Sequence, residues 1–157
     1  MNRKQFNQSR HDYNRIPLVR EVFADLDTPL SAYLKLADEP YTYLFESVQG
    51  GEKWGRYSII GMACSTLIKV FGSRVQLQVD GEVVSDEETS DPLRFIETYL
   101  DRFKVAEAEC LPKFHGGLVG YFGYDTIRYI EPKLSHCPNP DKHQTPDILL
   151  MLSDRLV

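Results

Sequence analysis

The dipeptide Asp80-Gly81 lies between two apolar runs and most restricts the fold that this chain can adopt. An Asp-Gly pair favours a two-residue hairpin turn because both central positions of that turn need a positive φ. In the preceding run, 74–79, apolar residues alternate with polar ones, as in a strand with one buried face. Another apolar run, 65–71, precedes it across Gly72-Ser73. The pattern predicts an antiparallel meander with one solvent-exposed face.

A second hairpin is predicted over 41–61, where two aromatic and apolar runs flank a Gly-Gly turn. In the first run Glu46 and Ser47 stand among apolar residues. A buried polar group without a partner is costly, so we expect this polar step to have one. The partner is either a ligand or, for Glu46, a basic residue across the hairpin, Lys53 or Arg56. The period of a strand places Glu46 and Ser47 on opposite faces unless a bulge or the turn intervenes.

Two segments carry the same signal for the start of a helix. Thr28 and Asp91 are each followed by a proline, as is typical of an N-cap and the first helical position. The first predicted helix ends before Pro40, and the second runs to about Lys104 and covers a sheet. Apolar residues follow at helical spacing, namely Leu30, Tyr33, Leu34 and Ala37 in the first helix and Leu93, Ile96, Leu100 and Phe103 in the second.

The connecting segments have weaker signals. Residues 16–25 mix apolar and charged side chains, and we interpret them as an edge strand. Residues 85–90, SDEETS, are expected to form an acidic surface loop. The glycine-spaced run 118–124 favours a strand in which each glycine admits a neighbouring backbone or a ligand. Asp125, in apolar surroundings, is expected to cap a short helix over 126–131.

The last run, 147–157, reads DILLMLSDRLV and predicts a buried strand. We expect this strand to leave an open sheet edge, because an apolar strand at a chain end has no later segment to cover it. On this interpretation the sequence is cut from a longer protein, and the fragment self-associates through that edge.

Composition limits the class of protein. The 157 residues carry a net charge of −5 and are 42% hydrophobic, which favours one globular domain and gives no basic stripe for nucleic acid. The polar segment 1–15 lacks the apolar centre of a signal peptide, and no run is long enough to span a membrane, so we expect a cytoplasmic protein. Cys64, Cys110 and Cys137 are too widely spaced for a disulfide framework or a zinc site.

Motifs for catalysis and for nucleotide binding are absent from the sequence. The glycines of 116–123 spell neither a dinucleotide-binding nor a P-loop fingerprint. No GxSxG or HExxH pattern occurs. The histidines, cysteine and aspartate of the loop 134–144 have no spacing that faces one point, so we interpret this loop as exposed and not as a metal site.

Three stretches together resemble one family. DLDTPLSAYLKL (25–36), YLFES followed by GRYSIIG (43–61), and GGLVGYFGYDTIRYIE (116–131) are similar to the N-terminal region of the large subunit, component I, of anthranilate synthase. That subunit belongs to the chorismate-utilising enzymes. The resemblance covers nearly all of the chain after residue 15, in the order and spacing of the family.

The resemblance implies an effector site and no active site in this chain. The family's Leu-Leu-Glu-Ser element forms part of its tryptophan feedback site and here reads Leu44-Phe45-Glu46-Ser47, with Phe45 in place of leucine. Phe45, Glu46 and Ser47 would meet tryptophan, with Arg56 as a further member. No cofactor is implied for this chain, because the Mg²⁺ site and the chorismate-binding groups of the family lie in a C-terminal domain that this chain lacks.

The resemblance also implies a reaction, a partner and an architecture. The parent enzyme would convert chorismate and glutamine into anthranilate, pyruvate and glutamate with a glutamine amidotransferase subunit. Residues 16–157 would be its N-terminal regulatory domain, an α+β structure with a mostly antiparallel sheet or sandwich and two or three covering helices. The alternatives are the large subunit of aminodeoxychorismate synthase and a non-catalytic binding module in which Glu46 is structural.

Overall fold

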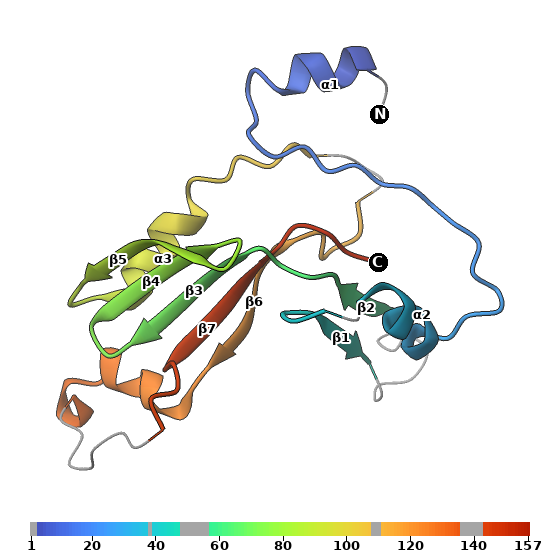
Figure 1. Cartoon of the computed structure of the whole chain (residues 1–157). Coiled ribbons are helices and arrows are strands. Elements are labelled where there is room, and N and C mark those ends of the chain that lie inside the picture. Colours follow the sequence, from blue (N-terminus) through green and yellow to red (C-terminus); the bar gives the residue numbers. More distant parts are fainter. Residues whose placement is uncertain (1–2, 38, 48–56, 108–110, 136–142) are drawn as a thin grey trace.

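Two antiparallel sheets form the centre of the molecule (Figure 1). The computed structural model describes residues 3–37, 39–47, 57–107, 111–135 and 143–157. The strands are β1 (Tyr43–Glu46), β2 (Ser58–Gly61), β3 (Thr66–Phe71), β4 (Arg74–Val79), β5 (Glu82–Glu88), β6 (Gly117–Phe122) and β7 (Ile148–Ser153). The helices are α1 (Arg3–Ser9), α2 (Pro29–Leu36), α3 (Pro92–Leu100) and the 3-10 helices η2 (Tyr124–Tyr129) and η3 (Pro132–Leu134). The expected α+β fold is confirmed.

The five-stranded sheet contains the predicted meander. Its strand order is β5-β4-β3-β7-β6, and β1 and β2 pair separately as the predicted hairpin. At the turn between β4 and β5, Asp80 and Gly81 have φ values of 52° and 84°, as the Asp-Gly signal requires.

Both predicted helix starts are confirmed. The Thr28 side chain accepts a hydrogen bond from the Ser31 backbone N–H, and the Asp91 side chain accepts one from the Arg94 backbone N–H. The second helix, α3, ends at Leu100, four residues before the expected end. Tyr99, and not Leu100, is the residue of its last turn that is buried.

The final strand is not an edge strand, which corrects the expected open edge. Strand β7 pairs with β3 on one side and with β6 on the other, so its backbone is paired along both edges. The local sequence could not predict this position, because the pairing partners come from distant parts of the chain. In the described residues the edges of the large sheet are β5 and β6, so the expectation of self-association through the last strand loses its basis.

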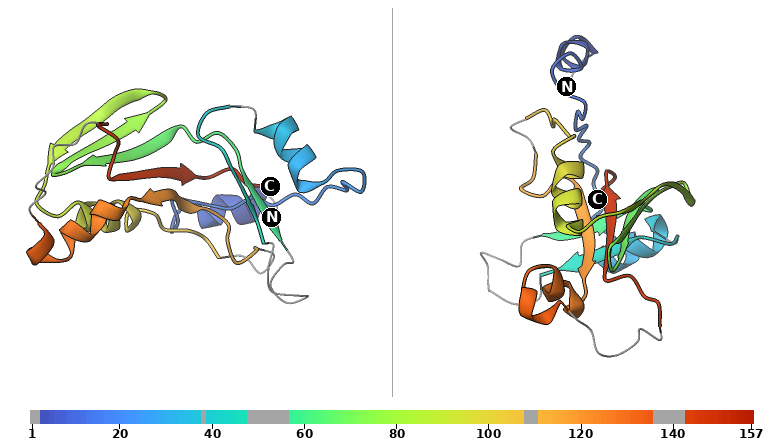
Figure 2. Two further views of the ribbon diagram at one scale, coloured as in Figure 1. Left: turned by 90° about the horizontal axis from the view of Figure 1, so that it is seen from below. Right: turned by 90° about the vertical axis from the view of Figure 1, so that its left-hand side faces the viewer.

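The two faces of the large sheet bury separate hydrophobic clusters. One face packs against α3, which lies over it in Figure 2, and buries seven residues: Ile68, Val70, Val75, Ile96, Tyr99, Ile148 and Leu150. The opposite face buries a smaller cluster of Tyr43, Cys64, Leu67, Val119 and Met151, which joins the hairpin to the sheet. Alternate residues of β3 and β7 therefore supply both clusters.

The predicted acidic loop is wrong in its first part, since residues 85–88 belong to β5. The guanidinium of Arg74 on β4 binds the carboxylate of Asp86 at 2.5 Å, and the Ser73 hydroxyl donates to Glu88 at 2.5 Å. These cross-strand contacts pair the acidic side chains and keep the segment extended.

The prediction of a strand over 16–25 is also wrong. Residues 16–24 are extended but belong to no sheet among the described residues, and only the neighbouring Arg15 makes an isolated bridge, with Val105. No described strand lies beside them to complete a ladder (Figure 1).

The predicted cap at Asp125 is wrong as well. The 3-10 helix η2 begins two residues earlier than expected, at Tyr124 after Gly123, and Asp125 is exposed within its first turn. There it binds Arg128 at 3.0 Å. Asp125 and Arg128 are three residues apart, so their side chains lie on the same side of the helix and can form this ion pair.

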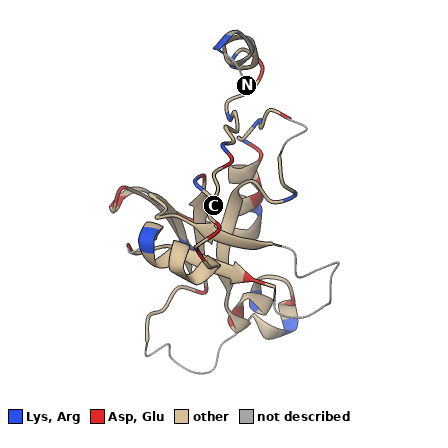
Figure 3. Cartoon of the chain, turned by 90° about the vertical axis from the view of Figure 1, so that its right-hand side faces the viewer, with Lys and Arg blue, Asp and Glu red and all other residues tan. Residues whose placement is uncertain are grey.

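Acidic and basic side chains are interspersed over the described part of the chain (Figure 3). None of the helices that the structure describes combines the length and the apolar character that crossing a membrane requires.

Gly120 provides a test of the packing between β6 and β7. A Cβ atom at this position would overlap the backbone carbonyl of Leu149, so the close approach predicted for a glycine of this run is present. We expect Gly120→Ala to destabilise the protein by about 2 to 3 kcal/mol, measured by urea denaturation. The matched control is Val84→Ala on the exposed side of β5, which should change stability by less than about 0.5 kcal/mol. An equal effect of the two substitutions would contradict this packing.

The Arg74–Asp86 pair predicts a pH dependence of stability. Hydrogen bonds from Arg74 and then Gln76 lower the pKa of Asp86 to about 2. A carboxyl group whose pKa is lower in the folded state stabilises the protein above its unfolded pKa, near 4, and loses that contribution as the pH falls toward 2. We therefore expect Asp86→Asn to be less stable than the wild type at pH 6, with the difference disappearing between about pH 4 and pH 2. Glu82→Gln removes the same charge from β5 at a position without an ion pair among the described residues, and it is the control for net charge.

Candidate functional site

The hairpin of β1 and β2 carries the predicted effector residues. Phe45 lies opposite Ile59, and Glu46 lies opposite Ser58, in a regular antiparallel register without a bulge. Tyr43 and Phe45 therefore share one face of β1, and their rings lie 4.8 Å apart. Glu46 is on the other face, and Ser47 follows the last residue of the strand.

Glu46 and Ser47 lie at the surface, so the expectation that they are buried is wrong. Burial falls along β1 from Tyr43, which is buried, to Glu46, which is exposed. Phe45 is 50% exposed, and Ser47 is also exposed. The second hydrophobic cluster covers only the start of the strand. Glu46 thus needs no internal partner, and its carboxylate makes no hydrogen bond or ion pair with another described residue.

A buried hydrogen bond fixes the hairpin to the large sheet. The hydroxyl groups of Tyr43 and Ser153 lie 2.7 Å apart, and Ser153 is only 1% exposed. The Cys64 thiol is buried in the same cluster. Burial raises the pKa of the Tyr43 hydroxyl and of the Cys64 thiol, so both groups remain protonated at neutral pH.

The segment after β7 pairs with β2 of the hairpin. Ile60 and Val157 exchange two backbone hydrogen bonds, of 2.7 and 2.9 Å, and the Met62 N–H donates to the carbonyl of Arg155. The Arg155 guanidinium also donates to the Ala63 carbonyl at 2.6 Å. Strand β2 is therefore paired on both sides, while β1 is paired only with β2 among the described residues.

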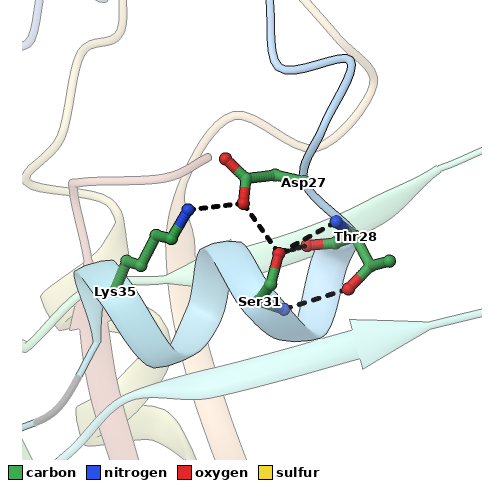
Figure 4. Close-up of polar contacts among 4 residues, drawn as sticks. All are labelled: Asp27, Thr28, Ser31 and Lys35. Carbon is green, nitrogen blue, oxygen red and sulfur yellow. Dashed lines mark hydrogen bonds and ion pairs between the residues drawn. The ribbon is translucent and has the colours of Figure 1, made fainter.

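A polar network fixes the start of α2 beside the hairpin (Figure 4). The Asp27 carboxylate accepts hydrogen bonds from the Ser31 hydroxyl at 2.8 Å and from the Lys35 ammonium at 2.6 Å. These contacts, that of Lys35 first, lower the pKa of Asp27. Thr28 and Ser31 complete a reciprocal capping box. The Tyr33 hydroxyl lies 2.8 Å from that of Thr42, just before β1.

An open hollow of about 320 Å³ lies between α2 and the chain that leads to β1. It is lined by Tyr33, Leu34, Ala37, Glu39 and Pro40. None of these lining residues is an effector residue implied by the resemblance. The hollow therefore adds no support to the predicted site.

Several predicted positions fall outside the described residues. Arg56, the fourth effector residue, and Lys53, the alternative partner of Glu46, are among them, as is most of the loop 134–144. Within the described part of the chain no three His, Cys, Asp or Glu side chains are grouped so that they could hold a metal ion.

Similarity to known proteins covers the whole chain and is not limited to the hairpin. Anthranilate synthase component 1 of Pseudomonas aeruginosa is 56% identical over 158 residues, which cover 100% of this chain and 32% of that protein. The chain belongs to the anthranilate synthase component 1 family. The component 1 proteins of Neisseria meningitidis serogroup B and of Aquifex aeolicus are 55% and 42% identical and cover 95% and 93% of the chain. No protein-family model matches the chain.

The similarity locates this chain within component 1. It corresponds to the N-terminal part of these relatives and spans about a third of their length. The family resemblance drawn from the three sequence stretches is thereby confirmed. The roles of Phe45, Glu46, Ser47 and Arg56 remain predictions.

The sequence analysis missed the residues that position the site. Tyr43 and Ser153 are 110 residues apart, and neither lies in a pattern that suggests a contact. The one available signal was a serine at the end of an otherwise apolar strand, since a buried hydroxyl needs a partner.

The Tyr43–Ser153 bond predicts a coupled loss of stability. Tyr43→Phe should cost about 1 to 3 kcal/mol in urea denaturation, because it removes the buried hydrogen bond between the Tyr43 and Ser153 hydroxyl groups. The double variant Tyr43→Phe/Ser153→Ala should cost clearly less than the sum of the two single changes. Tyr124→Phe, at a position that is 94% exposed, is the matched control and should be neutral. Additive single effects would show that the two hydroxyl groups are not coupled.

Proposed function

We propose that this chain forms the N-terminal regulatory domain, residues 16–157, of an anthranilate synthase large subunit and supplies part of a site for the feedback inhibitor tryptophan. The observation that carries the proposal is the 56% identity to a component 1 protein over the whole chain. The hairpin adds physical support, because Phe45, Glu46 and Ser47 are all accessible at the end of β1, with Glu46 on the opposite face from Phe45.

The chemistry of these side chains suits a zwitterionic aromatic amino acid. The Glu46 carboxylate would accept hydrogen bonds from the ammonium group, and Arg56 or a backbone N–H would donate to the carboxylate. Phe45, whose ring lies against Tyr43, would form the apolar wall for the indole. The Ser47 hydroxyl would provide a further hydrogen bond and limit the size of the ligand.

The position of the hairpin suits a regulatory role. Tyr43, three residues before Glu46, is hydrogen-bonded to Ser153 on β7, an interior strand of the large sheet. A ligand that shifts the hairpin would therefore act on β7 through a buried contact. Feedback of this kind requires only that tryptophan binds one arrangement of the hairpin more tightly than the other.

The activity of the whole protein belongs to the same proposal. We expect the complete large subunit to convert chorismate to anthranilate and pyruvate in the cytoplasm, with ammonia supplied by a glutamine amidotransferase subunit. The Mg²⁺ and chorismate sites would lie in the two-thirds of component 1 that this chain does not span. The names of the relatives favour this function over an aminodeoxychorismate synthase or a free-standing binding module.

Tryptophan binding tests the site. The assay uses a full-length chimaera in which this chain replaces the aligned N-terminal region of the P. aeruginosa relative. In isothermal titration calorimetry we expect Glu46→Gln to weaken tryptophan binding by roughly tenfold or more, because a hydrogen bond to a charged group is lost. Ser47→Leu should abolish the heat of binding, because the larger side chain fills the site. Glu82→Gln, a matched carboxylate change on β5, should leave the affinity unchanged.

The same chimaera links the site to activity. Anthranilate formation from chorismate and glutamine, with the amidotransferase subunit present, is measured with and without tryptophan. The wild type should be inhibited, and Ser47→Leu should be active and insensitive. A wild-type enzyme that is active and indifferent to tryptophan would overturn the site assignment without affecting the family membership.

A further inference from the structure

The segment that leads into α2 carries the two most exposed large apolar side chains of the described chain. We define residues 16–36 as the apolar strap. Phe23 is 96% exposed and Leu26 is 101% exposed. The most exposed apolar residues of the strap are Leu18, Val22, Phe23, Leu26, Leu30 and Leu34. So many exposed apolar side chains in one segment are typical of a surface that contacts another protein.

The backbone of the first part of the strap, residues 16–23, is also without partners among the described residues. From residue 16 to residue 23, no backbone group exchanges a hydrogen bond with another described residue. Figure 1 shows this part of the chain as an open arc between α1 and α2, apart from both sheets. Extended backbone with unpaired N–H and C=O groups can add to the edge of a sheet. The segment thus offers both apolar side chains and free backbone groups to an occupant.

Helices α2 and α3 begin with the same sequence signal but differ in how far their apolar faces are buried. Helix α3 buries Ile96 and Tyr99 against the large sheet, as its apolar period predicts. Helix α2 has an equivalent apolar period but buries none of its own residues, and Leu30 and Leu34 are 54% and 65% exposed. Its apolar face is therefore only partly covered within the described chain, where α2 contacts the hairpin of β1 and β2.

We infer that the apolar strap docks onto the C-terminal two-thirds of component 1 and is covered in the full-length subunit. The relatives are about three times as long as this chain, so a large part of the same polypeptide is available as the occupant. The charges of the strap also favour a protein surface. Arg20, Glu21 and Asp25 include both signs and form no basic cluster for an anionic membrane or for nucleic acid.

This inference rests on family membership and is independent of tryptophan binding. Its test is amide hydrogen exchange, measured by mass spectrometry without tryptophan, on the isolated chain and on the full-length chimaera. Peptides that cover 16–27 should exchange at least tenfold more slowly in the chimaera. On this inference, the edge strand β5 is covered in neither protein. Peptides from β5 should therefore exchange equally in both.

Paired variants identify the side chains that make the contact. Phe23→Ser/Leu26→Ser in the chimaera should remove most of the protection of 16–27, while Val84→Ser, an exposed apolar residue of β5, should leave it intact. Both sets of positions are exposed in this chain, so neither variant should change the circular dichroism spectrum of the isolated chain.

Two results would overturn the inference. The first is equal hydrogen exchange of 16–27 in the isolated chain and in the chimaera. The same measurement on the aligned segment of the full-length P. aeruginosa relative is the control for the chimaera. The second is strong protection already in the isolated chain together with a dimeric mass by light scattering. If Phe23→Ser/Leu26→Ser converts that dimer to a monomer, a second copy of this chain is the occupant.

Discussion

The insertion of β7 between β3 and β6 is the interaction on which the rest of the structure depends. Both edges of β7 are hydrogen-bonded, and both of its faces are covered. Ile148 and Leu150 belong to the cluster under α3, whereas Met151 belongs to the cluster beneath the hairpin. A strand buried on both faces needs apolar residues at every position, which explains the continuous run Ile-Leu-Leu-Met-Leu. Besides β7, only β3 supplies buried residues to both clusters.

The hairpin depends on the same strand. The Tyr43 hydroxyl is bonded to Ser153 at the end of β7, and the following residues, 155–157, add to β2. One end of the hairpin is therefore fixed, while the end with Glu46 and Ser47 is accessible to solvent. This gradient from a buried aromatic residue to an exposed carboxylate is the geometry that a regulatory ligand would need, with rigid support on one side and access on the other.

The comparison of α2 and α3 shows how far a local pattern predicts tertiary contacts. Both helices begin with an N-cap residue and a proline, and both have apolar residues at helical spacing. The pattern correctly predicted that each segment forms a helix, because capping and periodicity act within a few residues. It could not predict what each helix covers. For α3 that surface is the large sheet, and for α2 much of the apolar face has no cover in the described chain.

The sequence by itself determined the elements whose energetics are local: the Asp80-Gly81 turn, the two helix starts, the meander and the hairpin of 41–61. It also carried the family identity, since motif order and spacing survive without coordinates. Only the tertiary structure decided that β7 is an interior strand, that residues 85–88 continue a strand, that 16–25 pairs with no described strand, and that Glu46 is exposed. Each of these depends on partners distant in sequence, such as Ser153 for Tyr43. Local propensity carries no information about such contacts, because their free energy arises only when the whole chain has folded.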